Sequence, residues 1–354
     1  MAASLPTKRC ELRDERAADQ TLARWREQAL QFEREVQKAV IGQPEAVRLL
    51  TISIFARGHV LLEGDVGVGK TTLLRAASRA LGGEFSRVEG TVDMMPSDII
   101  YHTYLADDGR PRVEPTAMLR RSDELSVFFF NEINRARPQV HSLLLRLMAE
   151  RTVTAFNREY WFPYLQVFAD RNMVEREETF ELPAAARDRF LMEITIGAPD
   201  DESIRRELIF DPRFQEVDAL IEQVRPGALD FREIPAFTQL IQKSVSASEA
   251  LQGYVLSLWR ALIEPVSFGV SLPDVDVGNL VRGGASPRGL AFLTRAARVR
   301  AWLEERDYLT PDDIRAVFVE VVAHRLFVDP IYAIRGDEPV KRLCRAIFEA
   351  VPTP

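Results

Sequence analysis

The stretch LLEGDVGVGKTTLLRA has the residue types and the spacing of a phosphate-binding loop. The residues concerned are Gly64, Asp65, Val66, Gly67, Val68, Gly69, Lys70, Thr71 and Thr72, and they fit the pattern G-x-x-x-x-G-K-[ST]. Glycines let backbone N–H groups turn inward around a β-phosphate, a lysine reaches the β and γ oxygens, and a threonine hydroxyl binds Mg²⁺. We therefore predict that this loop binds ATP with Mg²⁺; a chance match is the alternative.

A second stretch, VFFFNEINRA, supplies the other half of a nucleotide site. Hydrolysis requires an acidic group near Mg²⁺ at the end of another buried strand, and a base that orients the attacking water. Glu132 fits the base, whereas Asn131 occupies the metal-side position as a neutral amide. Because an amide brings no charge, we predict a loosely held Mg²⁺ and slow ATP hydrolysis. A core strand with a polar end is the alternative interpretation.

The elements around these residues alternate between strands and helices. GHVLLEG reads as a short buried strand and FSRVEG as a second strand, with a helix over KTTLLRAASRALGG between them, and LQVFAD reads as another buried strand. Two hairpins are expected, one turning at Asp108 and Gly109 and one at Asn157 and Arg158. The pattern predicts an α/β fold whose mostly parallel sheet is covered by helices on both faces.

The periodicity becomes helical after about residue 198. We expect an N-terminal extension over 1–25, an α/β domain over 26–198 and a helical domain over 199–354. The sequence around Thr310 is a strong helix start, because a capping residue precedes a proline and two acidic residues. The stretch 265–287 contains several Pro and Gly residues and is expected to be a loop.

Composition limits the classes of partner and the compartment. The chain of 354 residues has a net charge of −7, so no overall positive field favours nucleic acid. Its two cysteines, Cys10 and Cys344, lack the spacing of a metal site or a disulfide framework, which indicates a reducing compartment. No apolar stretch has the ~20 residues that span a bilayer. We expect a cytoplasmic protein that does not span a membrane.

Several blocks of the chain, taken in order, resemble those of the MoxR-type AAA+ ATPases. The blocks are VIGQPEAV, HVLLEGDVGVGKT, MMPSDII, NEINRARPQVHSLLLRLMAERTVT, ADRNMVEREETFELPAAARDRFL, GASPRGLAFLTRAAR and RDYLTPDDIRAVFVEVVAHRL. The resemblance implies a P-loop αβα core with β-hairpin inserts, followed by an α-helical lid. It also implies that Ile41 and Gly42, in the first block, contact the nucleotide.

The resemblance implies three further catalytic residues. Asn172 corresponds to sensor one, Arg189 to an arginine finger that a neighbouring subunit receives, and Arg288 to sensor two on the lid. Cationic guanidinium groups stabilise the charge on phosphate oxygens in the transition state. The chain departs from the family pattern at Asn131, where an aspartate is usual, and in DRNM beside sensor one; both departures bear on the rate of hydrolysis.

The function that the resemblance implies is an ATP-driven, chaperone-like machine. Family members form homo-oligomeric rings, and we expect a hexamer that acts with a von Willebrand factor A domain partner on a client enzyme. Several members assist metal or cofactor insertion, including insertion into methanol dehydrogenase. A weakly hydrolysing, ATP-binding scaffold is the alternative that Asn131 favours. A nucleic-acid motor is a third interpretation, kept open by Arg110, Arg112 and Arg158 at the expected hairpins.

Overall fold

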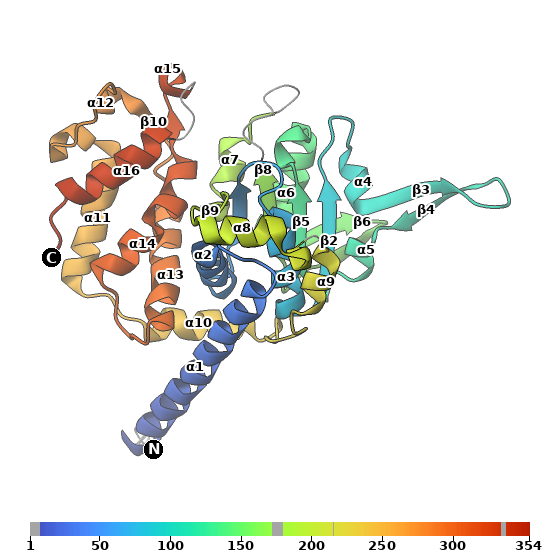
Figure 1. Cartoon of the computed structure of the whole chain (residues 1–354), viewed down its shortest axis with the longest axis horizontal. Helices are drawn as coiled ribbons and strands as arrows, with labels where there is room; N and C mark the ends of the chain where they lie inside the picture. The colour runs from blue at the N-terminus through green and yellow to red at the C-terminus, as the bar shows by residue number, and fades with distance from the viewer. Residues whose placement is uncertain (1–7, 172–179, 215, 334–337) are drawn as a thin grey trace, which may run out of the picture.

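The computed structural model describes residues 8–171, 180–214, 216–333 and 338–354, which form an α/β half and a helical half (Figure 1). A five-stranded sheet in the order β2-β5-β8-β1-β9 is the centre of the α/β half, and every neighbouring pair is parallel. The strands are β1 (His59–Glu63), β2 (Glu84–Glu89), β5 (Leu125–Asn131), β8 (Gln166–Arg171) and β9 (Phe190–Thr195). The predicted parallel sheet is confirmed.

Helices cover both faces of this sheet, and side chains alternate between the two cores. Val60 and Leu62 of β1 face one core, to which α1 (Lys8–Gln37), α2 (Pro44–Phe55) and α3 (Lys70–Leu81) contribute. Leu61, between them, faces the second core. The helices of that core are α4 (Pro96–Ile100), α5 (Ala117–Arg120), α6 (Pro138–Glu150) and α7 (Ala184–Arg187). Burial on two faces explains why the central parts of β1 and β5 are apolar runs.

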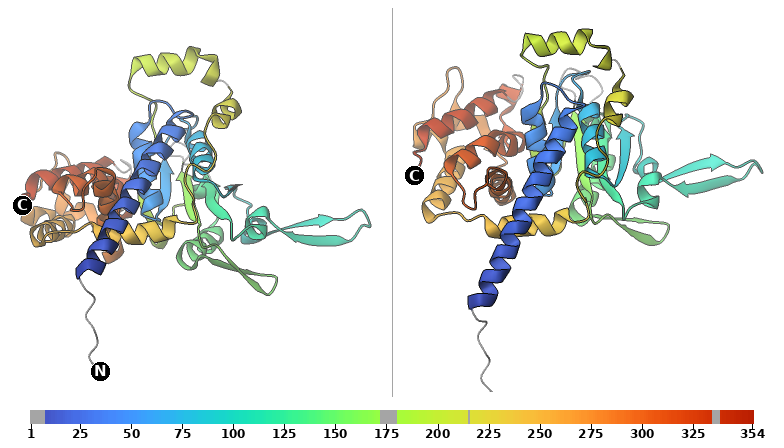
Figure 2. Two further views of the ribbon diagram at one scale, coloured as in Figure 1. Left: turned by 90° about the horizontal axis from the view of Figure 1, so that it is seen from below. Right: turned by 60° about the horizontal axis from the view of Figure 1, so that its bottom comes forward.

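Two antiparallel hairpins project from the α/β half on the side away from the helical half (Figure 2). One pairs β3 (Tyr101–Leu105) with β4 (Pro111–Pro115), and the other pairs β6 (Thr152–Ala155) with β7 (Arg158–Trp161). The first turns at Gly109 as expected, with φ +74°. The second turns at Phe156 and Asn157, with φ +51° and +57°, so the expected pair is wrong by one residue. Two successive left-handed residues give the twist that a two-residue hairpin requires.

The helical half begins with segments that lie against the α/β half. These are α8 (Glu202–Phe210), η2 (Pro212–Phe214), α9 (Val217–Glu222) and α10 (Ile234–Ser244), and they precede a bundle of α11 (Glu249–Ile263), α13 (Pro287–Leu303), α14 (Pro311–Val322) and α16 (Glu338–Ala350). The Thr310 backbone N–H donates to Asp313 Oδ2 at 2.9 Å, which confirms the helix start. None of the helices in the described ranges is long and apolar enough to cross a membrane.

The stretch 265–287 is not a simple loop. It contains η3 (Pro265–Phe268), α12 (Val277–Leu280) and β10 (Val281–Gly283), and β10 pairs with β11 (Phe327–Val328) beyond η4 (Ala323–Arg325); α15 (Pro330–Ala333) completes the elements. The expectation of a loop was wrong because the partner of β10 lies more than forty residues further along the chain. Short elements that depend on such distant partners leave no local periodicity.

Candidate nucleotide site

The phosphate-binding loop connects the carboxyl end of β1 to the first turn of α3. Gly67 and Gly69 have φ of +85° and +92°, and a Cβ at either position would meet no atom within 4 Å. Glycine is required there for the left-handed backbone and not for lack of space. At Gly64 the reason is steric, since a Cβ would lie 2.3 Å from the carbonyl oxygen of Ile196. The open space over Gly67 and Gly69 fits a phosphate group.

Lys70 is held inside the loop by two oxygen atoms of its own chain. Its Nζ donates to the carbonyl oxygen of Gly64 at 2.6 Å and lies 3.3 Å from Asp170 Oδ2. Asp170 is the penultimate residue of β8 and is almost fully buried. Burial raises the pKa of the Asp170 carboxyl, and the Glu132 amide and Lys70 oppose that rise. An acidic side chain that the sequence did not single out therefore lies directly beside the loop lysine.

Strand β5 ends at the two residues that the sequence assigned to hydrolysis. Asn131 is its last residue and is buried, and Glu132 follows in a left-handed conformation with φ +54°. This conformation costs a residue other than glycine roughly 1 kcal/mol or more, so the surrounding structure must impose it. Gly90 makes room for the turn, because a Cβ there would lie 2.3 Å from the Glu132 carbonyl oxygen. Glu132 Oε2 lies 2.9 Å from Arg135 Nη1.

A cavity of about 560 Å³ lies beside the loop. Its lining includes residues that the sequence assigned to the nucleotide: Ile41, Val66, Gly67, Val68, Gly69 and Thr72. Its volume and mixed lining are typical of a small-molecule site. Phosphates on the loop and a base in the cavity therefore fit the residues present. Gly42 instead lines a neighbouring cavity of about 580 Å³.

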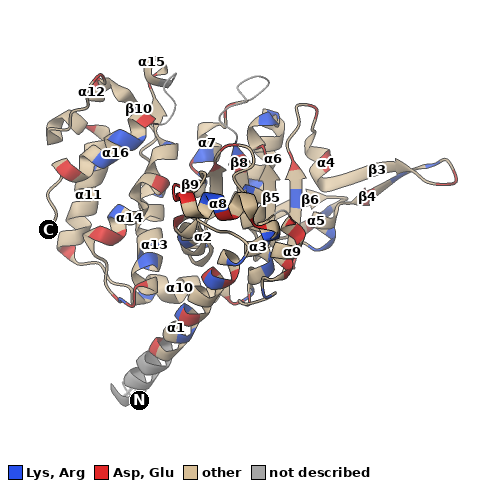
Figure 3. Ribbon diagram, in the orientation of Figure 1, with Lys and Arg blue, Asp and Glu red and all other residues tan. Residues whose placement is uncertain are grey.

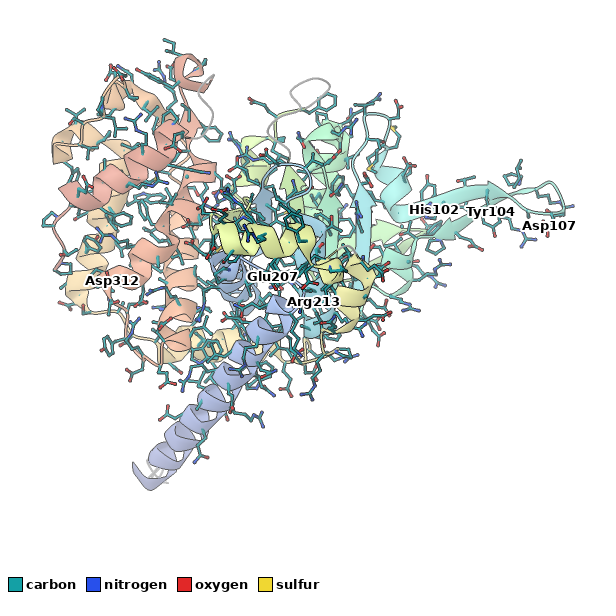
Figure 4. The ribbon with its side chains drawn as sticks, viewed as in Figure 1. His102, Tyr104, Asp107, Glu207, Arg213 and Asp312 are labelled. Carbon is teal, nitrogen blue, oxygen red and sulfur yellow. The ribbon has the colours of Figure 1, made fainter. Side chains whose placement is uncertain are left out.

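The sequence did not predict that α8 and η2 would cover this cavity. The residues that they contribute are Arg205, Leu208, Ile209 and Phe214. A hydrogen bond of 3.0 Å from Arg213 Nη2 to Glu207 Oε1 joins η2 to α8 (Figure 4). The only local signal is the amphipathic stretch ESIRRELIF, which shows that α8 has an apolar side but not what that side covers.

Arg189 and Arg288 lie near each other but away from the loop of their own chain. Arg189 directly precedes β9, whose first residue, Phe190, pairs with His59 at the start of β1. The phosphate loop follows the other end of β1, which five residues at about 3.3 Å each place roughly 16 Å away. Arg288 binds Asp188, the residue before Arg189. Asn172 lies outside the described residues.

A phosphate loop that follows the first strand of a five-stranded parallel sheet, with a helical domain after it, defines an ATPase of the AAA+ class. In agreement, residues 59–192 match the family of ATPases associated with various cellular activities (AAA), and residues 276–343 match the AAA lid domain. The chain belongs to the MoxR family of AAA+ ATPases.

The relatives that show this membership match nearly the whole chain. Protein MoxR of Methylorubrum extorquens is 66% identical over 96% of this chain and 99% of its own length. Chaperone MoxR1 of Mycobacterium tuberculosis is 35% identical over 82% of this chain and 74% of its own. A crystal structure of a Cytophaga hutchinsonii protein, 28% identical, has a TM-score of 0.81 and covers 97% of this chain and 99% of its own. Family membership supports nucleotide binding and ATP hydrolysis in general.

Proposed function

We propose that this chain is one subunit of a hexameric ring that uses ATP to remodel a client protein. The observation that carries the proposal is the position of Arg189 and Arg288 near the amino ends of β1 and β9, whereas the phosphate loop follows the carboxyl end of β1. From that end they cannot reach a nucleotide on their own loop, but they can reach one on a neighbouring subunit. A ring gives every loop such a neighbour.

The residues of the loop and of β5 have different roles at the proposed site. Lys70 and the backbone N–H groups of the loop would bind phosphate oxygens, while Thr71 and Asn131 would hold Mg²⁺, which neutralises phosphate charge. Glu132 would orient the attacking water as the base. Asn172, Arg189 and Arg288 would act on the γ-phosphate, with both arginines coming from the neighbour. Because Asn131 has no charge, we expect slow turnover that needs a high Mg²⁺ concentration.

The hairpins favour a protein client over nucleic acid. Leu105, Val113 and Trp161 expose 73%, 49% and 59% of their surfaces on these hairpins, which is typical of protein contact sites. Asp108 Oδ2 lies 3.7 Å from Arg112 Nη2. The tip of the β3–β4 hairpin therefore carries negative as well as positive charge. Figure 3 shows acidic and basic residues interspersed over the described part of the ribbon. Binding of the chain to DNA that weakens with salt would restore the motor alternative.

The client and the partner are proposed from the relatives. Chaperone MoxR1 is named as a chaperone, and the similarity of this chain to it supports a chaperone-like activity. We propose a von Willebrand factor A domain protein as partner and maturation of a metalloenzyme, of the methanol dehydrogenase kind, as the outcome. We also propose domain boundaries after residues 25 and 198. We propose a cytoplasmic location for the protein. The first boundary falls within α1.

The second candidate function is an ATP-binding scaffold, which Asn131 favours. One experiment distinguishes it from an ATP-driven machine. Phosphate release is measured against Mg²⁺ concentration for the wild type, Asn131→Asp and Glu132→Gln. The machine predicts slow wild-type release, faster release at lower Mg²⁺ for Asn131→Asp, and an ATP-bound ring with little release for Glu132→Gln. A wild type that releases no phosphate at any Mg²⁺ concentration, although rings and client are present, would establish the scaffold instead.

A further inference from the structure

Asp170 lies on β8, on the strand next to the β5 position where the family usually has an aspartate and this chain has Asn131. Its Oδ2 is 3.3 Å from Lys70 Nζ, and its Oδ1 accepts a hydrogen bond of 2.5 Å from the backbone N–H of Glu132. One carboxylate thus contacts both the phosphate-binding lysine and the residue assigned as the base. Its side chain is about 3% exposed, so bulk water screens its charge only weakly.

The register of the sheet places Asp170 beside Asn131. Phe130 of β5 pairs with Ala169 of β8, so the next residues, Asn131 and Asp170, are neighbours on adjacent parallel strands. Side chains in register on parallel strands point to the same face. Phe129 and Phe168, one pleat earlier, belong to the core on the α3 side. Both polar side chains therefore face the helix that starts with Lys70 and Thr71.

We propose that Asp170 supplies, from the adjacent strand, the negative charge toward Mg²⁺ that Asn131 lacks. Mg²⁺ prefers carboxylate, hydroxyl and water oxygens, and Asp170 adds a carboxylate to the amide of Asn131 and the hydroxyl of Thr71. The inference rests on the proposed nucleotide site. The carboxylate of Asp170, one strand away, therefore reduces the loss of Mg²⁺ affinity that the neutral Asn131 is expected to cause.

The competing role for Asp170 is to neutralise Lys70 only while phosphate is absent. The two roles predict different effects on nucleotide affinity. A carboxylate near Mg²⁺ repels phosphates when the metal is missing and attracts the metal when it is present, so its removal should strengthen metal-free binding and weaken metal-bound binding. A carboxylate that only competes with phosphates for Lys70 should, when removed, strengthen both to the same extent.

The test measures the affinity of a fluorescent ATP analogue for the full-length protein in Mg²⁺ and in EDTA. The measured quantity is the ratio of the two affinities, which requires no turnover. Asp170→Asn is expected to lower the ratio at least about tenfold, and Asn131→Asp combined with Asp170→Asn is expected to restore it. Glu193→Gln, which removes another buried carboxylate of the same sheet, serves as the matched control and should keep the wild-type ratio. If Asp170→Asn does not fold, Asp170→Thr replaces it, because threonine suits a strand.

An unchanged ratio in the Asp170 variant, or equal strengthening in Mg²⁺ and EDTA, would overturn the inference and leave the nucleotide site intact. Failure of the wild type to bind the analogue under either condition would instead refute the proposed function. Competition of Mn²⁺ for the complex, followed by electron paramagnetic resonance, gives a second readout. Weaker Mn²⁺ binding in the Asp170 variant, reversed in the double variant, is the expected result.

Discussion

The carboxylate of Asp188 binds the guanidinium of Arg288, with Oδ2 2.6 Å from Nη1. Asp188 Oδ1 also accepts from Ser286 Oγ at 2.6 Å and from Arg325 Nη1 at 3.1 Å. The residue that precedes Arg189 is therefore fixed to the first turn of α13 and to η4. This arrangement keeps two arginines at one edge of the subunit, where a neighbour's phosphate loop is the expected target.

The position of Arg189 predicts complementation between inactive subunits. Arg189→Ala should leave nucleotide affinity within about threefold and reduce turnover by at least about tenfold, because an arginine finger stabilises only the transition state. Mixing it with Lys70→Ala subunits should restore part of the phosphate release, since an interface between the loop of an Arg189→Ala subunit and the finger of a Lys70→Ala subunit has both groups intact. Arg146→Ala, an exposed arginine on α6, is the control. No recovery in rings shown to be mixed would contradict a role across the interface.

The contacts of Lys70 predict its effect on binding. Lys70→Ala should weaken ATP affinity by more than about a hundredfold, because the phosphates lose their only fixed side-chain cation in the loop 64–72. Isothermal titration calorimetry with ATP and Mg²⁺ measures the change. Lys38→Ala removes an exposed lysine that pairs with Glu35 and should leave the affinity unchanged. Equal affinity in both variants would mean that the loop does not hold the phosphates.

A fully buried carboxylate in the helical half predicts a loss of stability. Asp313 accepts hydrogen bonds from Arg300 Nη1 at 2.5 Å and from Arg306 Nη2 at 2.6 Å. Asp313→Asn leaves both guanidinium groups without their anion and should cost about 3 kcal/mol of unfolding free energy. Asp312→Asn, one residue earlier and labelled in Figure 4, should cost less than about 1 kcal/mol. Urea denaturation of both variants is the measurement, and similar losses would argue against the buried network.

The cavity between α2, β9 and α16 predicts a pH-dependent contribution from Glu320. Burial raises the pKa of this carboxyl to about 7 from 4.5, Glu45 adds to the rise, and Lys341 and Arg345 oppose it. A folded-state pKa above the unfolded value means that stability falls as the pH rises from about 4.5 to 7. The full effect is at most about 3 kcal/mol, and less because the side chain is partly exposed.

Glu320→Gln removes that titration and should therefore be more stable than the wild type at about pH 8, with no difference at about pH 4.5. Unfolding free energies from urea titrations at the two pH values provide the comparison. Glu349→Gln, an exposed residue of α16, is the control and should follow the wild type. If the Glu320→Gln variant gains the same stability at both pH values, the gain comes from packing instead of ionisation.

The sequence predicted most of the α/β half because its signals are local. The motif over 64–72 and the apolar runs of β1 and β5 each identify an element without knowledge of its neighbours. The position of Asp170 depends on β8 lying between β5 and β1, which is a non-local strand order. The edge at which Arg189 lies depends likewise on the register of β9 against β1. Neither fact leaves a periodic signal in the chain, so only the structure reveals these contacts.

Helix α1 crosses from one half of the subunit to the other (Figure 2). Its Leu22 carbonyl accepts a hydrogen bond from Trp302 Nε1 of α13 at 3.2 Å, and Trp25 stacks on Phe237 of α10 at 3.7 Å between ring centroids. Further along, α1 packs against α2 and α3. Because α1 packs against helices of both halves, it resists hinge motion between them. In the proposed ring, we therefore expect each subunit to turn as a rigid body, so that conformational changes occur as rotations between neighbouring subunits.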